Sequence, residues 1–184
     1  MKPAEFPLSP GLSPVRGERR QTASLSPCGR GIEGEGAVFH VNMAAARILC
    51  IGNRFVGEDN FGPRVYDTLA GMEYPDEVEI VDGGLAGLNL LRYLEDGRQV
   101  IFVDAVSGFA PIGEITVIDG DTVARQSTGG FGHEAGLPFL LRVLPAVVDN
   151  PPPRIRLVGC EGGASDSAVL DAARLSLQLA LEAR

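Results

Sequence analysis

The chain has 184 residues and a mass of 19.4 kDa, with 16 lysines and arginines against 24 aspartates and glutamates and a formal net charge of −8. This length fits one domain, and a composition that is 45% hydrophobic and 22% charged is typical of a globular protein with a proper core. The acidity argues against nucleic acid and anionic membranes as partners, since neither attracts an acidic chain.

Residues 1–42 differ in composition from the rest of the chain. They are rich in Pro, Gly, Ser and Arg, and they lack helical or strand periodicity. Such a segment buries too little apolar surface to offset its ordering entropy, so we expect disorder. No apolar run follows Lys2, which excludes a secretory signal, and the acids in this segment argue against a transit peptide. We therefore expect residues 1–42 to be a flexible tail or an over-extended reading frame, with one α/β domain over residues 43–184.

Two further features bear on where the protein works. The sequence contains no apolar stretch of the roughly 18 residues that a membrane span needs. The three cysteines, Cys28, Cys50 and Cys160, are far apart and form no CxxC, which argues against a disulfide framework or a zinc site. Cys50 and Cys160 lie in or beside apolar runs, so we expect inert core residues. The prediction is a reduced, cytoplasmic protein.

Strands and helices are predicted to alternate after Met43. Apolar runs predict five strands, at 46–51, 77–81, 99–103, 114–118 and 155–158. Helical spacing and capping residues predict helices near 63–72, 88–94, 134–144 and from Ser165 or Asp166 onward. This order specifies a three-layer α/β/α sandwich around a mostly parallel five-stranded twisted sheet. Ligands bind such sheets at the carboxyl ends of the strands, so the segments that follow the strands are the candidate sites.

The segment after the first predicted strand reads Gly52-Asn53-Arg54-Phe55-Val56-Gly57-Glu58-Asp59-Asn60-Phe61-Gly62. A dinucleotide fingerprint would need a glycine in place of Arg54, and two adjacent acids would repel a pyrophosphate, so a Rossmann site is not favoured. Glu58 and Asp59 precede a predicted helix. Acids there often cap free N–H groups and complement the helix dipole, so capping is one interpretation of this pair and ligand binding is the other.

Asp104 and His133 are the other candidates at this edge of the sheet. Asp104 follows the third apolar run, where it is either a ligand-binding carboxylate or a solvated turn residue. His133 follows a glycine-rich segment, where it is either a functional residue or a polar residue on the surface. Taken with Glu58 and Asp59, these residues could converge from three loops. Two carboxylates and one histidine that leave open positions suit a borderline divalent ion.

A further segment, Asp82-Gly83-Gly84, closes the second predicted strand. Its glycines permit positive φ and close backbone approach, which suits either a groove for an extended peptide or a plain tight turn. The sequence carries no zincin, α/β-hydrolase, P-loop or EF-hand signature. The chemistry therefore has to come from the acids and the histidine.

These segments together resemble the hydrogenase maturation proteases, endopeptidases that remove a C-terminal extension from the nickel-iron hydrogenase large subunit after nickel insertion. The matching segments, in chain order, are 52–62, 81–91, 100–106 and 133–138. The resemblance extends over about residues 46–184. Three departures stand out: Glu58-Asp59-Asn60 replaces the usual Asp-Asp/Glu-Gly, Leu85 stands where threonine is common, and Phe55 replaces leucine, which we expect to be only a packing change.

The resemblance implies a role for each matching residue. Asp59, Asp104 and His133 would bind the metal. Asp59, Asp104 and Glu58 would be the catalytic residues, with Glu58 or Asp59 orienting water as general base. Whether the metal polarises the scissile carbonyl, activates water or only registers the substrate is left open by the residues.

The resemblance also implies the partners. The substrate would be the nickel-iron hydrogenase large-subunit precursor, with its peptide bound at Asp82, Gly83 and Gly84. Nickel would come with the precursor, and no organic cofactor, nucleic acid or membrane is expected. We expect a cytoplasmic monomer. Two other functions stay open at this point: a non-catalytic chaperone that binds nickel or the precursor, and a nucleotide-binding α/β module suggested by the fold alone.

Overall fold

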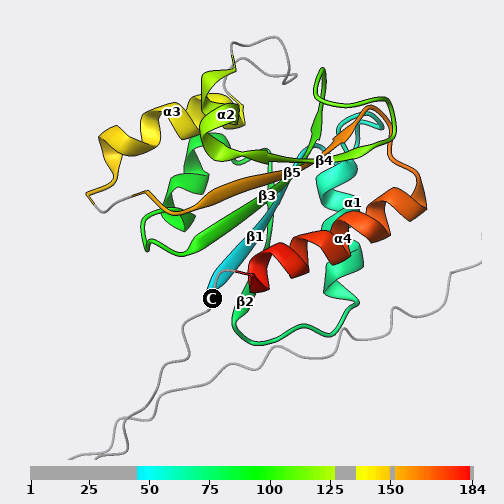
Figure 1. Cartoon of the computed structure of the whole chain (residues 1–184), viewed down its shortest axis with the longest axis horizontal. Coiled ribbons are helices and arrows are strands. Elements are labelled where there is room, and N and C mark those ends of the chain that lie inside the picture. The colour runs from blue at the N-terminus through cyan, green and yellow to red at the C-terminus, as the bar shows by residue number, and fades with distance from the viewer. Residues whose placement is uncertain (1–44, 127–135, 150–151, 183–184) are drawn as a thin grey trace, which may run out of the picture. The chain divides into compact units, whose positions relative to one another are not determined.

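A computed structural model describes residues 45–126, 136–149 and 152–182 (Figure 1). Its strands are β1 (Ala46–Ile51), β2 (Val78–Gly84), β3 (Gln99–Val106), β4 (Ile115–Asp119) and β5 (Ile155–Glu161). Its helices are α1 (Phe61–Ala70), α2 (Gly120–Arg125), α3 (Leu137–Val147) and α4 (Asp166–Leu181), with a 3-10 helix η1 (Gly87–Tyr93). Residues 1–44 lie outside the described ranges, so the prediction of a disordered tail stays a prediction.

The five strands form one sheet in the order β2-β1-β3-β5-β4. The first four of these run parallel, and β4 runs antiparallel to β5. Every residue of β1 is buried, because the middle of a sheet with both faces covered has no side exposed to water. The predicted mostly parallel five-stranded sheet is therefore confirmed.

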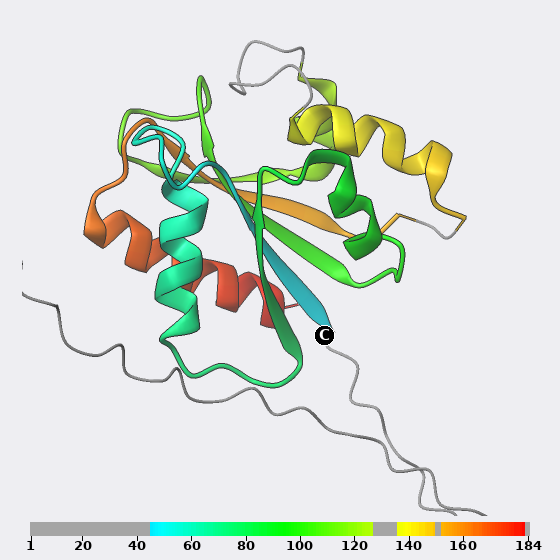
Figure 2. The same cartoon turned by 180° about the vertical axis from the view of Figure 1, so that it is seen from behind.

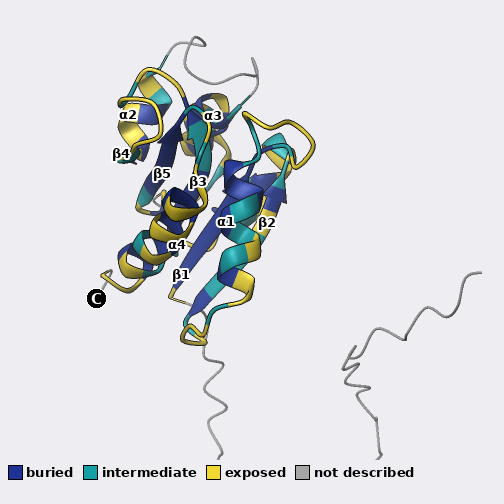
Figure 3. Cartoon of the chain, turned by 90° about the vertical axis from the view of Figure 1, so that its right-hand side faces the viewer, coloured by how far each residue is buried: buried dark blue, intermediate teal, exposed yellow. Residues whose placement is uncertain are grey.

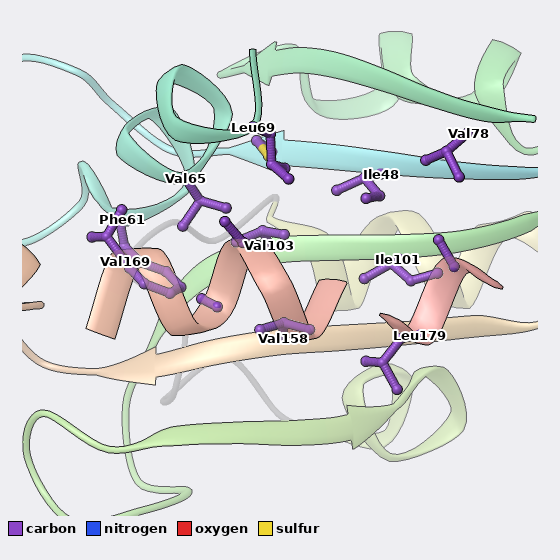
Figure 4. Packing of buried hydrophobic residues seen from close by; sticks show 14 of the residues in the cluster. Ile48, Phe61, Val65, Leu69, Val78, Ile101, Val103, Val158, Val169 and Leu179 are labelled. Atoms are coloured by element: carbon purple, nitrogen blue, oxygen red, sulfur yellow. The ribbon is translucent and has the colours of Figure 1, made fainter. Parts of the chain in front are cut away.

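Two layers of helices cover the sheet. Helices α1 and α4 lie on one face, and η1, α2 and α3 lie on the other (Figures 1 and 2). Seen from the side, the central strands β1, β3 and β5 are largely buried, and the outward faces of the helices are exposed (Figure 3). Figure 4 shows the first core, where side chains of α1 and α4 such as Val65 and Val169 pack with Val103 and Val158 of the sheet. The structure is the three-layer α/β/α sandwich that the sequence predicts.

Three strands, β2, β3 and β5, continue further than their apolar runs indicate, and β5 extends from its predicted end at residue 158 to Glu161. The third predicted strand ends at residue 103, but β3 extends to Val106 because its last residues pair with the end of β5. Asp104 pairs with Gly159, so Asp104 lies inside a strand and not in a turn after it. Strand β2 likewise extends to Gly84 and includes Asp82. The predicted ends of β2 and β3, just before these acids, were each three residues too early.

The helical predictions differ in detail. The segment near 88–94 forms the 3-10 helix η1, and the short helix α2 was not predicted. Ser165 is the N-cap of α4, and its side chain accepts a hydrogen bond from the backbone N–H of Ala168, as its position in the sequence indicates. Among the described residues, no helix is long and apolar enough to cross a membrane.

The described cysteines behave as core residues. Cys50 and Cys160 are both free and fully buried. Burial raises the pKa of each thiol above its ordinary value, so neither is ready to form the thiolate that attacks substrates or binds metals. This confirms the expectation of inert cysteines at these two positions.

Candidate active site

The site lies where the loops after β1, β3 and β5 gather at one end of the sheet (Figure 1). Gly62, in the first turn of α1, makes this close packing possible. A Cβ atom at Gly62 would overlap the carbonyl oxygen of Ile51 and lie 2.7 Å from that of Val103. Helix α1 therefore begins in direct contact with the carboxyl ends of β1 and β3, and the segment just before it lies beside the end of β3.

The loop after β1 is fastened to itself through Asn53 and Asp59. The backbone N–H of Asn53 donates to the Asp59 carbonyl oxygen at 2.8 Å and to the Asp59 carboxylate at 3.0 Å. Gly52 turns the chain here with a φ of 129°, and a Cβ at this position would overlap the Asp59 carbonyl oxygen. The loop thus fixes both the backbone and the carboxylate of Asp59.

The geometry decides against helix capping by these acids. The N-cap of α1 is Asn60, where no side chain caps the helix, and the first turn holds no acid. The Asp59 carboxylate accepts from Asn53 instead, and Glu58 is exposed. Asn60 has a φ of −95°, an ordinary value for an L-residue, so the backbone does not require the glycine of the motif that this segment resembles.

Asp104 lies close enough to Asp59 to feel its charge. Desolvation by burial raises the pKa of Asp104 well above its usual range, and repulsion from Asp59 raises it further. A hydrogen bond from the backbone N–H of Ala105 lowers the pKa of Asp104 and so partly offsets these two effects. Within the described part of the chain, no Lys or Arg forms an ion pair with Asp59 or Asp104. The two carboxylates form a pair that lacks a compensating cation there.

The third predicted metal ligand, His133, lies outside the described residues, as does Glu134 beside it. Residues 45–126, 136–149 and 152–182 contain no group of three His, Cys, Asp or Glu side chains that could hold a metal. The structure thus brings together two of the three predicted ligands, Asp59 and Asp104. The assignment of His133 stays a prediction.

Asp82, one of the predicted substrate-binding residues, forms an ion pair within the chain. Arg54 donates to the Asp82 carboxylate at 2.9 Å and to both oxygens of Asp67 at 2.7 and 3.0 Å. These bonds raise the pKa of Arg54 and hold its guanidinium between the loop, α1 and β2. Asp82 is therefore engaged in fastening the first loop to the end of β2.

The two glycines after Asp82 have different roles. A Cβ at the buried Gly83 would lie 2.8 Å from the Ile51 side chain, so this position allows β2 to pack closely on β1. Gly84 has a φ of 46°, and its carbonyl oxygen accepts from the backbone N–H of Gly52 at 3.0 Å. The end of β2 and the loop after β1 therefore lie side by side.

Sequence reasoning missed Glu161, the last residue of β5. Its buried carboxylate accepts hydrogen bonds from the backbone N–H groups of Gly108, Phe109 and Ala110, at 2.7, 3.0 and 3.4 Å. These bonds lower the pKa of Glu161. A glutamate after an apolar run was the available signal, but its partners are about 50 residues away in the chain. Glu161 fixes the loop that follows β3, and so the backbone just beyond Asp104.

The interpretation of Phe55 as a packing residue was wrong. Its side chain is 95% exposed, in the loop between β1 and α1. A hydrophobic side chain is buried only where other elements of the fold cover it. No described element covers Phe55.

The fold and the site together define a three-layer α/β protein with a carboxylate pair at the carboxyl end of a parallel sheet. The family model for hydrogenase maturation proteases matches residues 63–172, which include Asp104 and His133 and begin after Asp59. The chain belongs to this family, and it is a protease on that ground. Hydrogenase maturation proteases cleave the C-terminal extension of the hydrogenase large subunit.

Individual relatives agree with this assignment. The hydrogenase expression/formation protein HupD of Rhodobacter capsulatus is 32% identical over 117 residues, which are 62% of this chain and 55% of that one. HupD of Bradyrhizobium diazoefficiens is 29% identical over 146 residues, 73% of this chain and 75% of that one. Among solved structures, the hydrogenase maturating endopeptidase HybD from Escherichia coli matches with a TM-score of 0.58 and 26% identity, over 75% of this chain and 90% of that one.

Proposed function

We propose that this chain is an endopeptidase that cleaves the C-terminal extension of a nickel-iron hydrogenase large-subunit precursor, and that it reads the nickel of that precursor with Asp59 and Asp104. The observation that carries the proposal is the pair itself, which places two carboxylates together without a compensating cation from the described residues. Such a pair gains most when a cationic centre arrives with the substrate, because bound metal offsets both the repulsion and the desolvation.

Three residues have proposed roles toward the metal. Asp59 and Asp104 supply oxygen ligands, and His133 supplies the nitrogen ligand predicted from the sequence. Carboxylate and imidazole ligands together suit nickel and similar borderline ions. The nickel belongs to the precursor and is therefore part of the substrate, so the protein needs no resident metal and no organic cofactor. Metal binding places the adjoining peptide bond of the precursor beside the same carboxylates.

The reaction itself is a hydrolysis. A carboxylate of this group, Glu58 or Asp59, takes a proton from water as the water oxygen bonds to the scissile carbonyl carbon. The carbon–nitrogen bond then breaks, and the proton passes to the leaving nitrogen. The exposed position of Glu58 beside Asp59 supports this assignment, since a general base has to reach water and the substrate at once. We place the activity in the cytoplasm, with the protein acting as a monomer.

A comparison of two precursor preparations tests the proposal. The purified chain is incubated with the nickel-loaded precursor and, separately, with the same precursor free of nickel. Mass spectrometry then measures the masses of the products. We expect shortening of the nickel-loaded precursor alone. Cleavage of neither preparation, or of both equally, would contradict the proposal. Binding without shortening would instead favour the non-catalytic chaperone that the sequence left open.

A further inference from the structure

Four exposed apolar side chains lie on two hydrogen-bonded segments, one of which also contains Asp59. They belong to the loop after β1 and to the start of the segment after β2, and we name them the apolar rim. Their exposed fractions are 95% for Phe55, 46% for Val56, 61% for Leu85 and 48% for Leu88. Side chains of this kind are often exposed singly, but their gathering on adjacent loops at a functional edge is typical of an interaction surface.

The two segments of the rim are held together as one surface. The backbone N–H of Gly52 donates to the Gly84 carbonyl oxygen at 3.0 Å, and Arg54 donates to Asp82 at 2.9 Å. Asp59, one of the acid pair, closes the same loop through Asn53. The two segments of the apolar rim are therefore hydrogen-bonded to each other, and one of them holds Asp59.

Charge indicates what kind of partner fits here. On the rim side, the cation Arg54 is already compensated by Asp67 and Asp82. Asp59 and Asp104 have no such cation among the described residues. A complementary partner would therefore present a positive centre to the acid pair and apolar side chains next to it. An acidic partner would repel the two carboxylates. A uniformly polar partner would offer no apolar contacts to the apolar rim.

We propose that the apolar rim is the docking surface for the precursor, whose apolar side chains cover Phe55, Val56, Leu85 and Leu88 while its cationic metal centre faces Asp59 and Asp104. This inference rests on the proposed function and adds to it a surface for substrate recognition. In this arrangement the apolar rim binds the precursor, and Asp59 and Asp104 bind its metal. Loss of the rim should therefore weaken binding of the precursor more than it slows the bond-breaking step.

The test uses a rim variant and a matched control in the full-length chain. The rim variant is F55S/L85S, and the control is V147S/L170S, which removes two exposed apolar side chains from α3 and α4. Cleavage of the nickel-loaded precursor is measured over a range of concentrations, and binding of the same precursor is measured by calorimetry. We expect the rim variant to raise KM and weaken binding by about tenfold with little change in kcat, the size of one or two apolar hot-spot contacts. The control should match the wild type.

The outcomes separate this inference from the proposed function. If the wild type cleaves and the rim variant has the same KM and affinity, the inference is overturned and the proposed function stands. If the wild type binds the precursor without cleaving it, and the rim variant loses that binding, the inference stands and the proposed function falls. If the wild type does not bind the precursor, both are overturned. A change in the chain's own oligomeric state with unchanged precursor affinity would make the rim a self-interface and would also overturn the inference.

Discussion

The carboxylate of Asp59 lies close enough to Asp104 to raise the pKa of the Asp104 carboxyl, although one residue is in a loop and the other is in a strand. Asp59 ends the loop after β1, and Asp104 lies inside β3. Two like charges brought together in a partly buried position cost free energy, and protein folds keep such arrangements where function requires them.

This repulsion predicts that D104N stabilises the folded protein, even though the substitution slows cleavage. The amide has the shape of the carboxyl but no charge, so it removes both the repulsion from Asp59 and the cost of burying an ion. In the absence of nickel, we expect the free energy of unfolding to rise by about 1 kcal/mol. Thermal unfolding at neutral pH measures this. A lower melting temperature for D104N would show that the Asp104 charge is stabilised by the fold.

A second prediction concerns Gly62, where α1 meets the sheet. A Cβ atom there would overlap the Ile51 carbonyl oxygen and press on that of Val103, so G62A has to displace the start of α1. We expect a loss of about 1–3 kcal/mol in the free energy of unfolding. G57A is the matched control, because a Cβ at Gly57 meets nothing within 4 Å. Urea unfolding of both variants makes the comparison, and equal stabilities would refute the proposed packing role of Gly62.

The third prediction concerns Glu161 and pH. Three backbone N–H groups of residues 108–110 lower the pKa of Glu161 in the folded protein. The stabilisation is therefore fully present above the unfolded pKa of a glutamate and is lost as the pH falls through the lower folded value. We expect E161Q to melt at a lower temperature than the wild type at neutral pH, with the difference shrinking in acid.

The control for this experiment is E73Q, at an exposed position on the connection between α1 and β2. It removes one negative charge, as E161Q does, without touching the loop after β3. A difference between E161Q and the wild type that stays constant from neutral to acidic pH, or that E73Q reproduces, would argue against the role of the Glu161 carboxylate.

Much of this architecture could be predicted from the sequence because its signals are local. The run at 46–51 is apolar except for Arg47, and it forms β1 with the same bounds. Ser165 stands where a cap is expected, and it caps α4. The glycines that close the second predicted strand indicated a positive φ or a close backbone approach, and Gly84 has a φ of 46°.

The rest depends on partners that are distant in the chain. β3 continues through Asp104 because residues 159–161 of β5 pair with its end, and no local pattern shows that. The interpretation of Phe55 failed for the same reason, since burial depends on which elements come to lie over a side chain. Of the site, the charge of Asp59 acts on the Asp104 carboxyl, while the metal-binding roles of both residues and of His133 stay predictions.

The central claim is that Asp59 and Asp104 act together on the nickel-loaded precursor. The most direct measurement is the rate at which D59N, D104N and the control D76N, an exposed aspartate between α1 and β2, shorten that precursor. We predict that D59N and D104N each lose at least about a hundredfold in rate while D76N keeps the rate of the wild type. Near wild-type cleavage by either D59N or D104N would contradict the account.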